Sequence, residues 1–258
     1  MERIHLFELE DQAWFPRIIR DYGTDCMRFM SERAGVARVI AGKLKPVLAG
    51  TGDTEMLDLC SGGGGPAVAV AEQLKRDGHP VKVTLTDLYP NFGAFERARA
   101  GSGGMVDFVQ GSVDASSVPE ELAGLRTLFN AFHHFRPEQA RGILEDAVRQ
   151  RRAIAVCEVP QRTVLGVLLA LLLSPLLVLL ATPFIRPFRW SRIIFTYLIP
   201  AVLLLIWWDG LVSALRAYSP RELKELTAGL DPGGYVWEAG RGPLPRPITY
   251  LIGYPVSP

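Results

Sequence analysis

Apolar and polar positions follow two alternating patterns along the first 160 residues. Short apolar runs, typical of buried strands, alternate with stretches in which apolar residues recur at helical spacing, such as RPEQARGILEDAVRQR at 136–151. The short runs open the segments 55–60, 81–91, 105–119, 125–135 and 153–160. Strands that alternate with helices predict an α/β fold with a doubly wound, mostly parallel sheet.

The residues before the first strand predict two helices, from about Asp11 to Arg33 and from about Gly35 to Leu48. An apolar stripe recurs on the first helix at helical spacing: Trp14, Phe15, Ile18, Ile19 and Tyr22. The stripe fits packing against the sheet, and it also fits a lid over a ligand. We assign residues 1–50 to an N-terminal helical lid, with Trp14 as a candidate substrate contact.

Four consecutive glycines, Gly62 to Gly65, follow the first strand in LDLCSGGGGP at 57–66. Pro66 suits a first helical position, and Gly78 suits the residue just past the helix end. The glycines therefore predict a tight strand-to-helix turn. Its bare backbone, at the positive end of a helix, lets a ligand approach.

Two cofactors are compatible with this turn. Gly62, Gly64 and Ala67 match the dinucleotide fingerprint G-x-G-x-x-G/A, and Asp87 follows at a suitable distance for a ribose contact. The alternative is S-adenosylmethionine (SAM). Asp58, at the exit of the strand, would repel a pyrophosphate but would favour the sulfonium and ammonium groups of SAM. On charge, the sequence favours SAM.

Polar residues also follow the other predicted strands. The carboxyl ends of parallel strands meet at one edge of a sheet, where ligands bind. The residues expected to gather at that edge are Asp58, Asp87, Ser112, Asn130, His133, His134 and Glu158. Within this group, the turn at 111–114 is suited to line an adenine.

From about residue 55 to 160 the chain resembles the class I SAM-dependent methyltransferases, and its last 25 residues resemble them loosely. The first family motif is an acid followed by x-G-x-G-x-G. Here it reads Asp58, Leu59, Cys60, Ser61, Gly62, Gly63 and Gly64, so Cys60 replaces the first glycine. The resemblance implies a Rossmann-like fold, SAM as cofactor and a closing antiparallel hairpin in YVWEAGRGPLPRPITYLIGYP at 235–255.

The same resemblance implies cofactor contacts. Asp87 would bind the two ribose hydroxyls, and Ser112 and Val113 would bind the adenine edge. The predicted cofactor contacts are Asp58, Cys60, Ser61, Gly62, Gly64, Asp87, Leu88, Ser112, Val113 and Asn130. Residues 51–160 would form the SAM-binding core, completed by residues 218–258.

Charge and cysteine spacing narrow the class of protein. The net charge is +1 and no basic stripe is interleaved with aromatic residues, which disfavours a nucleic-acid partner. Cys26, Cys60 and Cys157 lack the spacing of metal ligands, so no metal site is predicted. Cys60 and Cys157 lie in predicted strands and are expected to be buried thiols of a reducing compartment.

Residues 161–217 depart from the α/β pattern. The run 163–185 contains no charged residue, and a second uncharged run spans 193–208. The first is long enough to cross a bilayer, which needs about 20 apolar residues, whereas the second would reach only about 24 Å as a helix. We predict an apolar helical insert that contacts a membrane. The alternative is a hydrophobic cap buried against the core or in an oligomer interface.

Topology and charge favour an insert that dips into one leaflet. The SAM-binding segments lie before and after it and must face the cytosol. A crossing hairpin would carry Arg186, Arg189 and Arg192 to the far side, against the positive-inside tendency. Pro175 and Pro200 would kink or break the helices. We therefore predict a re-entrant or interfacial insert at the cytoplasmic face of a membrane, with its arginines at the near headgroups.

Three residues are candidates for catalysis. His133 and His134 follow the fourth strand and titrate near neutral pH, so either is suited to remove a proton from a hydroxyl acceptor, and one of the two is expected to be structural. Glu158 ends the fifth strand. It would act as a second base, orient a histidine or form a salt bridge to Arg162.

The segment after the insert supplies candidate substrate contacts. Asp209, Ser213 and Arg216 recur at i, i+4 and i+7, and would project from one helix face toward the pocket mouth or form a surface ion pair. SPREL at 219–223 predicts the next helix start, with Ser219 as cap and Glu222 at the third position.

These patterns together predict a membrane-associated SAM-dependent methyltransferase whose acceptor is a hydrophobic small molecule or a lipid-like molecule. Two alternatives stay open. One is an NAD(P)-dependent oxidoreductase that uses the same glycine-rich turn, and the other is a non-catalytic, membrane-anchored scaffold.

Overall fold

The computed structural model describes residues 1–230, 233–243 and 248–256 of the chain. The chain divides into two compact units. Met1–Ala34 and Pro160–Tyr218 form the first, here called the apolar unit; Gly35–Val159 and Ser219–Pro258 form the second, here called the sheet unit. Residues 35–50, predicted from the sequence to be part of an N-terminal lid, belong to the sheet unit in this division.

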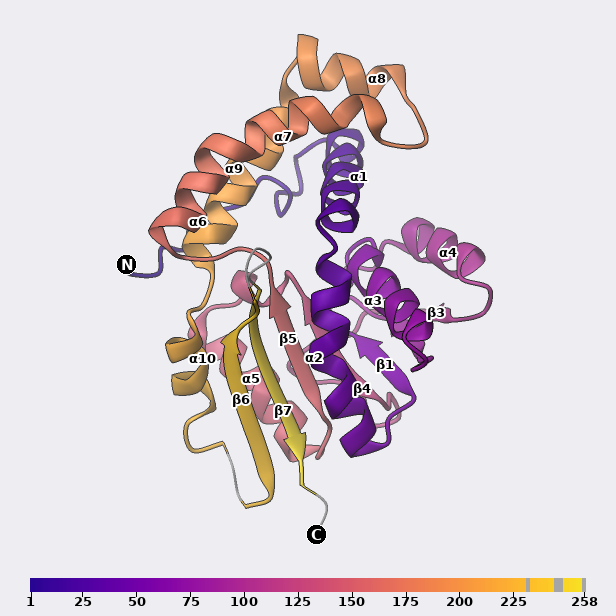
Figure 1. Cartoon of the computed structure of the whole chain (residues 1–258), viewed down its shortest axis with the longest axis vertical. Coiled ribbons are helices and arrows are strands. Elements are labelled where there is room, and N and C mark those ends of the chain that lie inside the picture. The colour runs from indigo at the N-terminus through magenta and orange to yellow at the C-terminus, as the bar shows by residue number, and fades with distance from the viewer. Residues whose placement is uncertain (231–232, 244–247, 257–258) are drawn as a thin grey trace. The chain divides into compact units, whose positions relative to one another are not determined.

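The sheet unit is built on a seven-stranded sheet with the order β3-β2-β1-β4-β5-β7-β6 (Figure 1). Its strands are β1 (Glu55–Asp58), β2 (Lys82–Leu85), β3 (Val106–Phe108), β4 (Leu125–Phe129), β5 (Ile154–Glu158), β6 (Tyr235–Arg241) and β7 (Thr249–Pro255). Strands β1 to β5 pair in parallel, and β7 pairs antiparallel with both β5 and β6. The predicted mostly parallel sheet and its closing antiparallel hairpin are confirmed.

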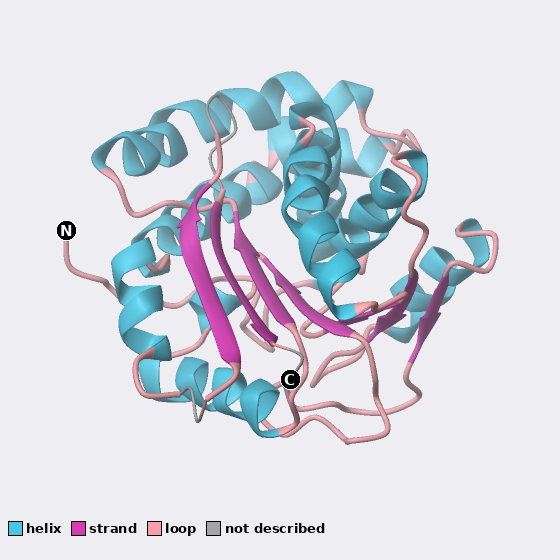
Figure 2. Cartoon of the chain, turned by 60° about the horizontal axis from the view of Figure 1, so that its bottom comes forward, coloured by secondary structure: helices cyan, strands magenta, loops and turns pink. Residues whose placement is uncertain are grey.

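Helices cover both faces of this sheet (Figure 2). The helices of the unit are α2 (Val36–Thr51), α3 (Gly65–Arg76), α4 (Phe92–Gly101), the short 3₁₀ helix η1 (Phe132–His134), α5 (Pro137–Arg149) and α10 (Pro220–Thr227). On one face, Leu44 of α2 and Leu74 of α3 share a buried cluster with Leu125 of β4. The next residue, Arg126, points to the opposite face, where it donates to Asp146 of α5 at 2.8 Å.

The start of α10 follows its sequence signal. The Ser219 hydroxyl accepts the backbone N–H of Glu222 at 3.3 Å, and the Glu222 carboxylate accepts the backbone N–H of Ser219 at 2.8 Å. This reciprocal pair is the capping box that SPREL predicts.

The apolar unit is helical apart from residues 1–16 and the connections between its helices. Its helices are α1 (Arg17–Ala34), α6 (Val164–Leu168), η2 (Leu169–Leu173), α7 (Ser174–Ala181), η3 (Thr182–Phe184), α8 (Trp190–Ile193), η4 (Ile194–Leu198) and α9 (Ala201–Arg216). The segments α6 to η3 make one helix of 21 residues, Val164–Phe184, in which η2 is a π-helical turn. Trp190–Leu198 and Ala201–Arg216 meet at a 68° bend, where Pro200 lies.

The first predicted helix begins later than expected. Helix α1 begins at Arg17, directly after Pro16, and the residues at 11–15 lie in turns and bends. Proline fixes its own φ and suits a helix start, so the apolar stripe ahead of it is not helical. Trp14 therefore lies outside the helix, with 70% of its surface exposed, and Ile18 is 46% exposed. Ile19 and Tyr22 are buried, but they share a cluster with Leu205 of α9 and do not pack against the sheet as predicted.

One of the three arginines expected at lipid headgroups is instead buried. The guanidinium of Arg192 donates to Asp25 of α1 at 2.5 Å and to the carbonyls of Ile185 and Pro187, both at 3.2 Å. The prediction was wrong for this residue because a local run of charges does not reveal a carboxylate brought in from a distant helix. Arg186 and Arg189 are exposed.

Candidate functional site

The glycine turn joins β1 to α3 through three residues with left-handed backbone. Cys60, Gly62 and Gly64 have φ values of +57°, +53° and +74°. A Cβ at Gly64 would lie 2.7 Å from the side chain of Leu85, whereas a Cβ at Gly62 would meet no atom within 4 Å. The left-handed backbone favours glycine at both positions; at 64 an added Cβ would also have to displace the end of the Leu85 side chain, whereas the space beside 62 is open to a ligand. Cys60 adopts this conformation despite a cost of about 1–2 kcal/mol for an L-residue.

We expect Gly64→Ala to lower the free energy of unfolding by about 2–4 kcal/mol, since backbone strain adds to overpacking against Leu85. Gly62→Ala is the matched control, because it has the same backbone region but open space, and should cost only the strain of about 1–2 kcal/mol. Urea denaturation of both variants measures the difference. Equal stabilities would mean that Leu85 moves aside at no cost.

Asp87 closes the turn from the neighbouring strand. Its Oδ2 accepts the N–H of Gly62 and its Oδ1 accepts the N–H of Tyr89, both at 2.9 Å. The Asp87 carbonyl accepts the N–H of Val113 at 2.9 Å, which holds the turn after β3 beside it. The predicted ribose acid, glycine turn and adenine turn thus meet at the carboxyl ends of β1, β2 and β3. Leu88, next to Asp87, is 43% exposed, and Ser112, next to Val113, is exposed.

Asp58 and Ser61 lie behind this turn and brace it. Asp58 is 3% exposed, and its Oδ1 accepts the hydroxyl of Thr127 on β4 at 2.8 Å. The Ser61 hydroxyl donates to the Asp58 carbonyl at 2.8 Å. The carboxylate beside the exposed part of the turn is therefore Asp87, and the charge argument for a cationic cofactor passes from Asp58 to that residue. Thr127 is a polar residue inside an apolar strand, and this position could have indicated from the sequence that a buried polar partner such as Asp58 lies beside it.

Burial raises the pKa of Asp58 from its ordinary value of 3.8 to about 7. Between these pH values the folded chain holds a proton that the unfolded chain releases, so the free energy of unfolding decreases as pH rises, by up to about 1.4 kcal/mol per pH unit. We expect Asp58→Asn to remove this slope. Urea denaturation of the wild type and the variant from about pH 4 to about pH 8 gives the free energy of unfolding at each pH. Equal slopes for the two proteins would contradict the role of Asp58.

A second group of predicted residues meets at the ends of β4 and β5. Nδ1 of His133 is hydrogen-bonded to Oε2 of Glu158, and Oε1 of Glu158 accepts the backbone N–H of Phe132 at 2.8 Å. Asn130, with a φ of +54°, accepts the N–H of Val159 at 2.8 Å through its Oδ1 and so ties the two strand ends together. Asparagine tolerates this backbone region better than most residues.

The two adjacent histidines differ in their surroundings. His133 is 2% exposed and paired with Glu158, whereas His134 is partly exposed. Their ring centroids are 4.4 Å apart. Because a carboxylate can only accept, the shared proton belongs to Nδ1, and the lone pair of the neutral His133 ring then lies on Nε2. Of the predicted roles of Glu158, orienting a histidine is the one its contacts support.

The predicted substrate contacts on α9 share one helix face and hold the N-terminal segment. Asp209 accepts the N–H groups of Leu9 and Glu10, at 2.6 and 3.0 Å. Ser213 donates to Glu8 at 3.0 Å, and Arg216 donates to the carbonyl of Leu6 at 2.7 Å. Each side chain thus has a structural role within the apolar unit, which sequence spacing could not reveal because its partners lie about 200 positions away.

No family model matches the sequence, and no curated protein matches it either. Several solved structures match the fold of the chain. The structure of the plantazolicin methyltransferase BpumL in complex with SAH aligns with a TM-score of 0.56 at 11% identity, over 96% of this chain and 93% of that one. The S-adenosylmethionine-dependent methyltransferase SibL, in its apo form, aligns with a TM-score of 0.51 at 15% identity, over 80% of this chain and 52% of that one.

This chain is shorter than many of the proteins it matches. It spans 51% of the pyocyanin biosynthetic protein PhzM and 60% of a putative O-methyltransferase from Nostoc punctiforme. At such identities the likeness concerns the fold, which is the Rossmann-like α/β fold of SAM-dependent methyltransferases.

Proposed function

We propose that this protein is a SAM-dependent methyltransferase that acts on a hydrophobic small-molecule or lipid-like acceptor at the cytoplasmic face of a membrane. The observation that carries the cofactor assignment is the bond between Asp87 and the N–H of Gly62. A pyrophosphate would need that amide and would meet a carboxylate there. The cationic, phosphate-free SAM fits the same arrangement, with its ribose hydroxyls donating to Asp87.

Residues of the sheet unit suit the remaining chemistry. SAM, when bound, supplies a methyl group on a positively charged sulfur. A protic acceptor gains that methyl and loses a proton, and Nε2 of His133 is the group suited to take the proton. Glu158 holds the imidazole through Nδ1 and stabilises the imidazolium that forms, while Phe132 N–H fixes the other carboxylate oxygen. Glu158 acts here as a positioning residue.

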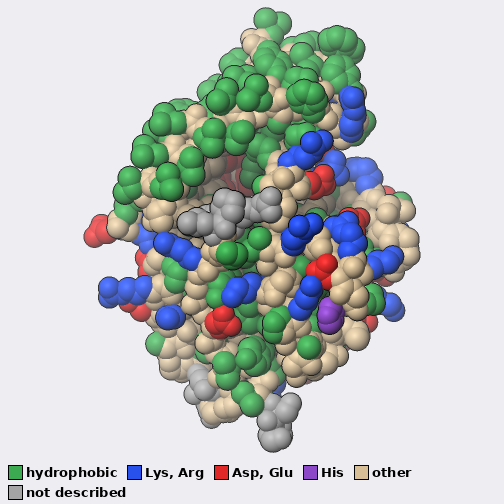
Figure 3. All heavy atoms as spheres, in the orientation of Figure 1, with side chains coloured by type: hydrophobic (Ala, Val, Ile, Leu, Met, Phe, Trp, Pro, Cys, Tyr) green, Lys and Arg blue, Asp and Glu red, His purple; other side chains and the backbone are tan. Residues whose placement is uncertain are grey.

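The apolar unit supports the membrane part of the proposal. Among the described residues, Val164–Phe184 is long and apolar enough to cross a membrane, and the bent pair Trp190–Leu198 and Ala201–Arg216 would make a second span if counted as one. Only 6% of the first helix's most apolar stretch is buried. Figure 3 shows hydrophobic side chains gathered over these helices. Exposed apolar surface of this extent is typical of a membrane or protein contact.

Calorimetry and label transfer test the proposal in two steps. Titration with SAM, NAD(H) and NADP(H) separates the cofactors, and we expect heat only with SAM. Incubation with radiolabelled SAM and a lipid extract then asks whether an extractable apolar species becomes labelled. Nicotinamide binding without SAM binding would favour the oxidoreductase. SAM binding without label transfer, and with cellular function unchanged when both histidines are replaced, would favour the scaffold.

A further inference from the structure

We infer that the apolar faces of two arms, Val164–Phe184 and Trp190–Arg216, lie in the hydrocarbon of one leaflet as a broken hairpin, and that Trp207 and Tyr197 allow this by capping backbone carbonyls that two prolines leave without a helical donor. The inference rests on the proposed membrane association and does not depend on methyl transfer. Its physical basis is that an uncapped carbonyl is cheap in water, which hydrates it, and costly in hydrocarbon.

The first cap lies at Pro175. Proline has no N–H, so the carbonyl four residues earlier, that of Leu171, lacks its usual helical donor. The indole N–H of Trp207, on α9, donates to this carbonyl at 3.0 Å. The break also produces the π-helical turn η2 just ahead of Pro175. There the hydroxyl of Ser174 donates to the carbonyl of Ala170 at 2.6 Å.

The second cap repeats the arrangement eight residues later. Pro183 removes the helical donor for the carbonyl of Leu179. The phenol of Tyr197, on η4, donates to this carbonyl. Leu171 and Leu179 are two turns apart and lie on the same side of the first arm. Each of the two freed carbonyls is therefore met by an aromatic donor from the second arm, in antiparallel order.

The surroundings of these caps are apolar and exposed. Leucines of the first arm are uncovered, with Leu172 at 68%, Leu180 at 60% and Leu165 at 65% exposure. On the second arm, Leu198 is 77% exposed. Exposed leucines with internally satisfied carbonyls are the combination that a helix in lipid requires, because no water is present to hydrate a broken turn. A bilayer is the partner that fits both observations.

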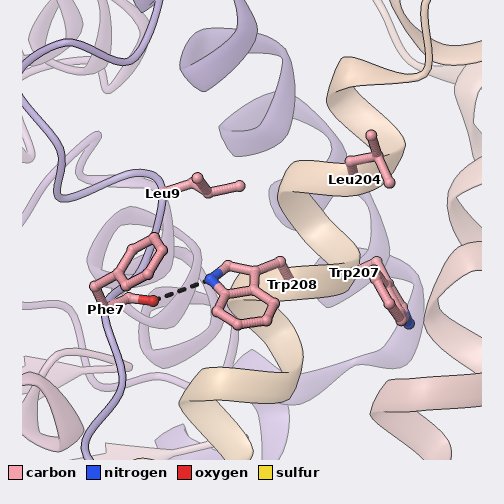
Figure 4. A pocket seen from close by; sticks show the side chains of 5 residues that line it. All are labelled: Phe7, Leu9, Leu204, Trp207 and Trp208. Atoms are coloured by element: carbon pink, nitrogen blue, oxygen red, sulfur yellow. Dashed lines mark hydrogen bonds between the residues drawn. The ribbon is translucent and has the colours of Figure 1, made fainter.

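Trp208 offers a matched control in the same helix. Its indole N–H donates to the carbonyl of Phe7 at 3.0 Å, a carbonyl outside both arms. Figure 4 shows Trp208 directed toward Phe7 while Trp207 projects from another side of α9. These residues, with Leu9 and Leu204, line an apolar pocket of about 260 Å³. Trp208→Phe thus changes the same residue type without touching a proline break.

A double-mutant cycle tests the inference on the full chain. Flotation with vesicles of phosphatidylcholine and phosphatidylglycerol, at high salt, measures the partition coefficient. We expect Trp207→Phe to lower this partition coefficient about tenfold, because the carbonyl of Leu171 would enter hydrocarbon without its donor. In a Pro175→Ala background, where residue 175 regains an N–H for Leu171, Trp207→Phe should change it less than about twofold. Tyr197→Phe with Pro183→Ala gives a second, independent cycle, and Trp208→Phe should behave as the wild type.

The outcomes separate this inference from the proposed function. The inference is supported if the wild-type protein floats with the vesicles and at least one of the two double-mutant cycles gives the expected partition coefficients. If it floats but Trp207→Phe and Tyr197→Phe have no effect in either background, the capping role is overturned and membrane association stands. If the wild-type protein stays in the soluble fraction as a defined oligomer, the apolar arms contact a second copy of the chain. That result would overturn both the insertion of the arms and the proposed membrane association. SAM calorimetry on the same samples shows separately whether the cofactor proposal holds.

Discussion

Replacing Asp87 by alanine should weaken SAM binding by at least about 100-fold. The variant loses the carboxylate that would accept two ribose hydroxyls, and hydrogen bonds to a charged group contribute about 1.5–3 kcal/mol each. It also releases the N–H of Gly62, now held at 2.9 Å, so the glycine turn loses a brace. Two such bonds correspond to a change of about 3 kcal/mol or more, which is at least two factors of ten in Kd.

Calorimetric titration with SAM measures this change, and Asp107→Ala is the matched control. Asp107 lies on the adjacent strand β3 with 74% of its side chain exposed, and pairs only with Arg99 at 3.6 Å among its described ion pairs. It should bind SAM as the wild type does. Thermal unfolding of the free proteins checks that both variants fold. An Asp87→Ala protein with unchanged affinity would remove the ribose assignment and with it the strongest support for SAM.

Local patterns predicted the elements of the sheet unit well because they depend on near neighbours. The glycine turn before Pro66 and the capping box of Ser219 and Glu222 involve residues within a few positions of one another. Where α1 begins was missed because Pro16 outweighed an apolar stripe that continues through it.

Burial of polar groups could not be predicted, because it depends on contacts between distant segments. The sequence suggested that Asp58 is an accessible carboxylate at a strand exit. Its Oδ1 instead accepts a hydrogen bond inside the sheet from the hydroxyl of Thr127, 69 positions later. Arg192 looked like a headgroup anchor, yet Asp25 holds it 167 positions away. In both cases the sequence identified the right residue type at the right element end, and the tertiary partner decided what the side chain does.

Two of the prolines in the apolar arms were predicted to break the helices, but the hydrogen-bond partners at the breaks were not predicted. The sequence indicated that Pro175 and Pro200 would break the helices, and the π-helical turn and the 68° bend are the breaks that formed. Which donors satisfy the freed carbonyls depends on how the arms pair. That pairing places Trp207 against the carbonyl of Leu171 and Tyr197 against the carbonyl of Leu179.

His133→Ala should lower kcat by about 10²- to 10⁴-fold while leaving SAM affinity unchanged, because general-base catalysis contributes in that range and His133 is not a predicted cofactor contact. The loss should narrow as pH rises, since an acceptor that ionises in solution no longer needs a base. His134→Ala, at the neighbouring and more exposed histidine, should stay within about tenfold of the wild type.

Glu158→Gln distinguishes positioning from a merely structural role. The amide keeps the size of the side chain but not the charge that stabilises the imidazolium, so kcat should fall by about 10²-fold or more with the KM for SAM unchanged. Initial rates of label transfer at saturating SAM, compared with calorimetry on the same variants, separate the two quantities. If His133→Ala and His134→Ala were equally active, proton removal would belong to another group, and the bond between His133 and Glu158 would serve only to join the ends of β4 and β5.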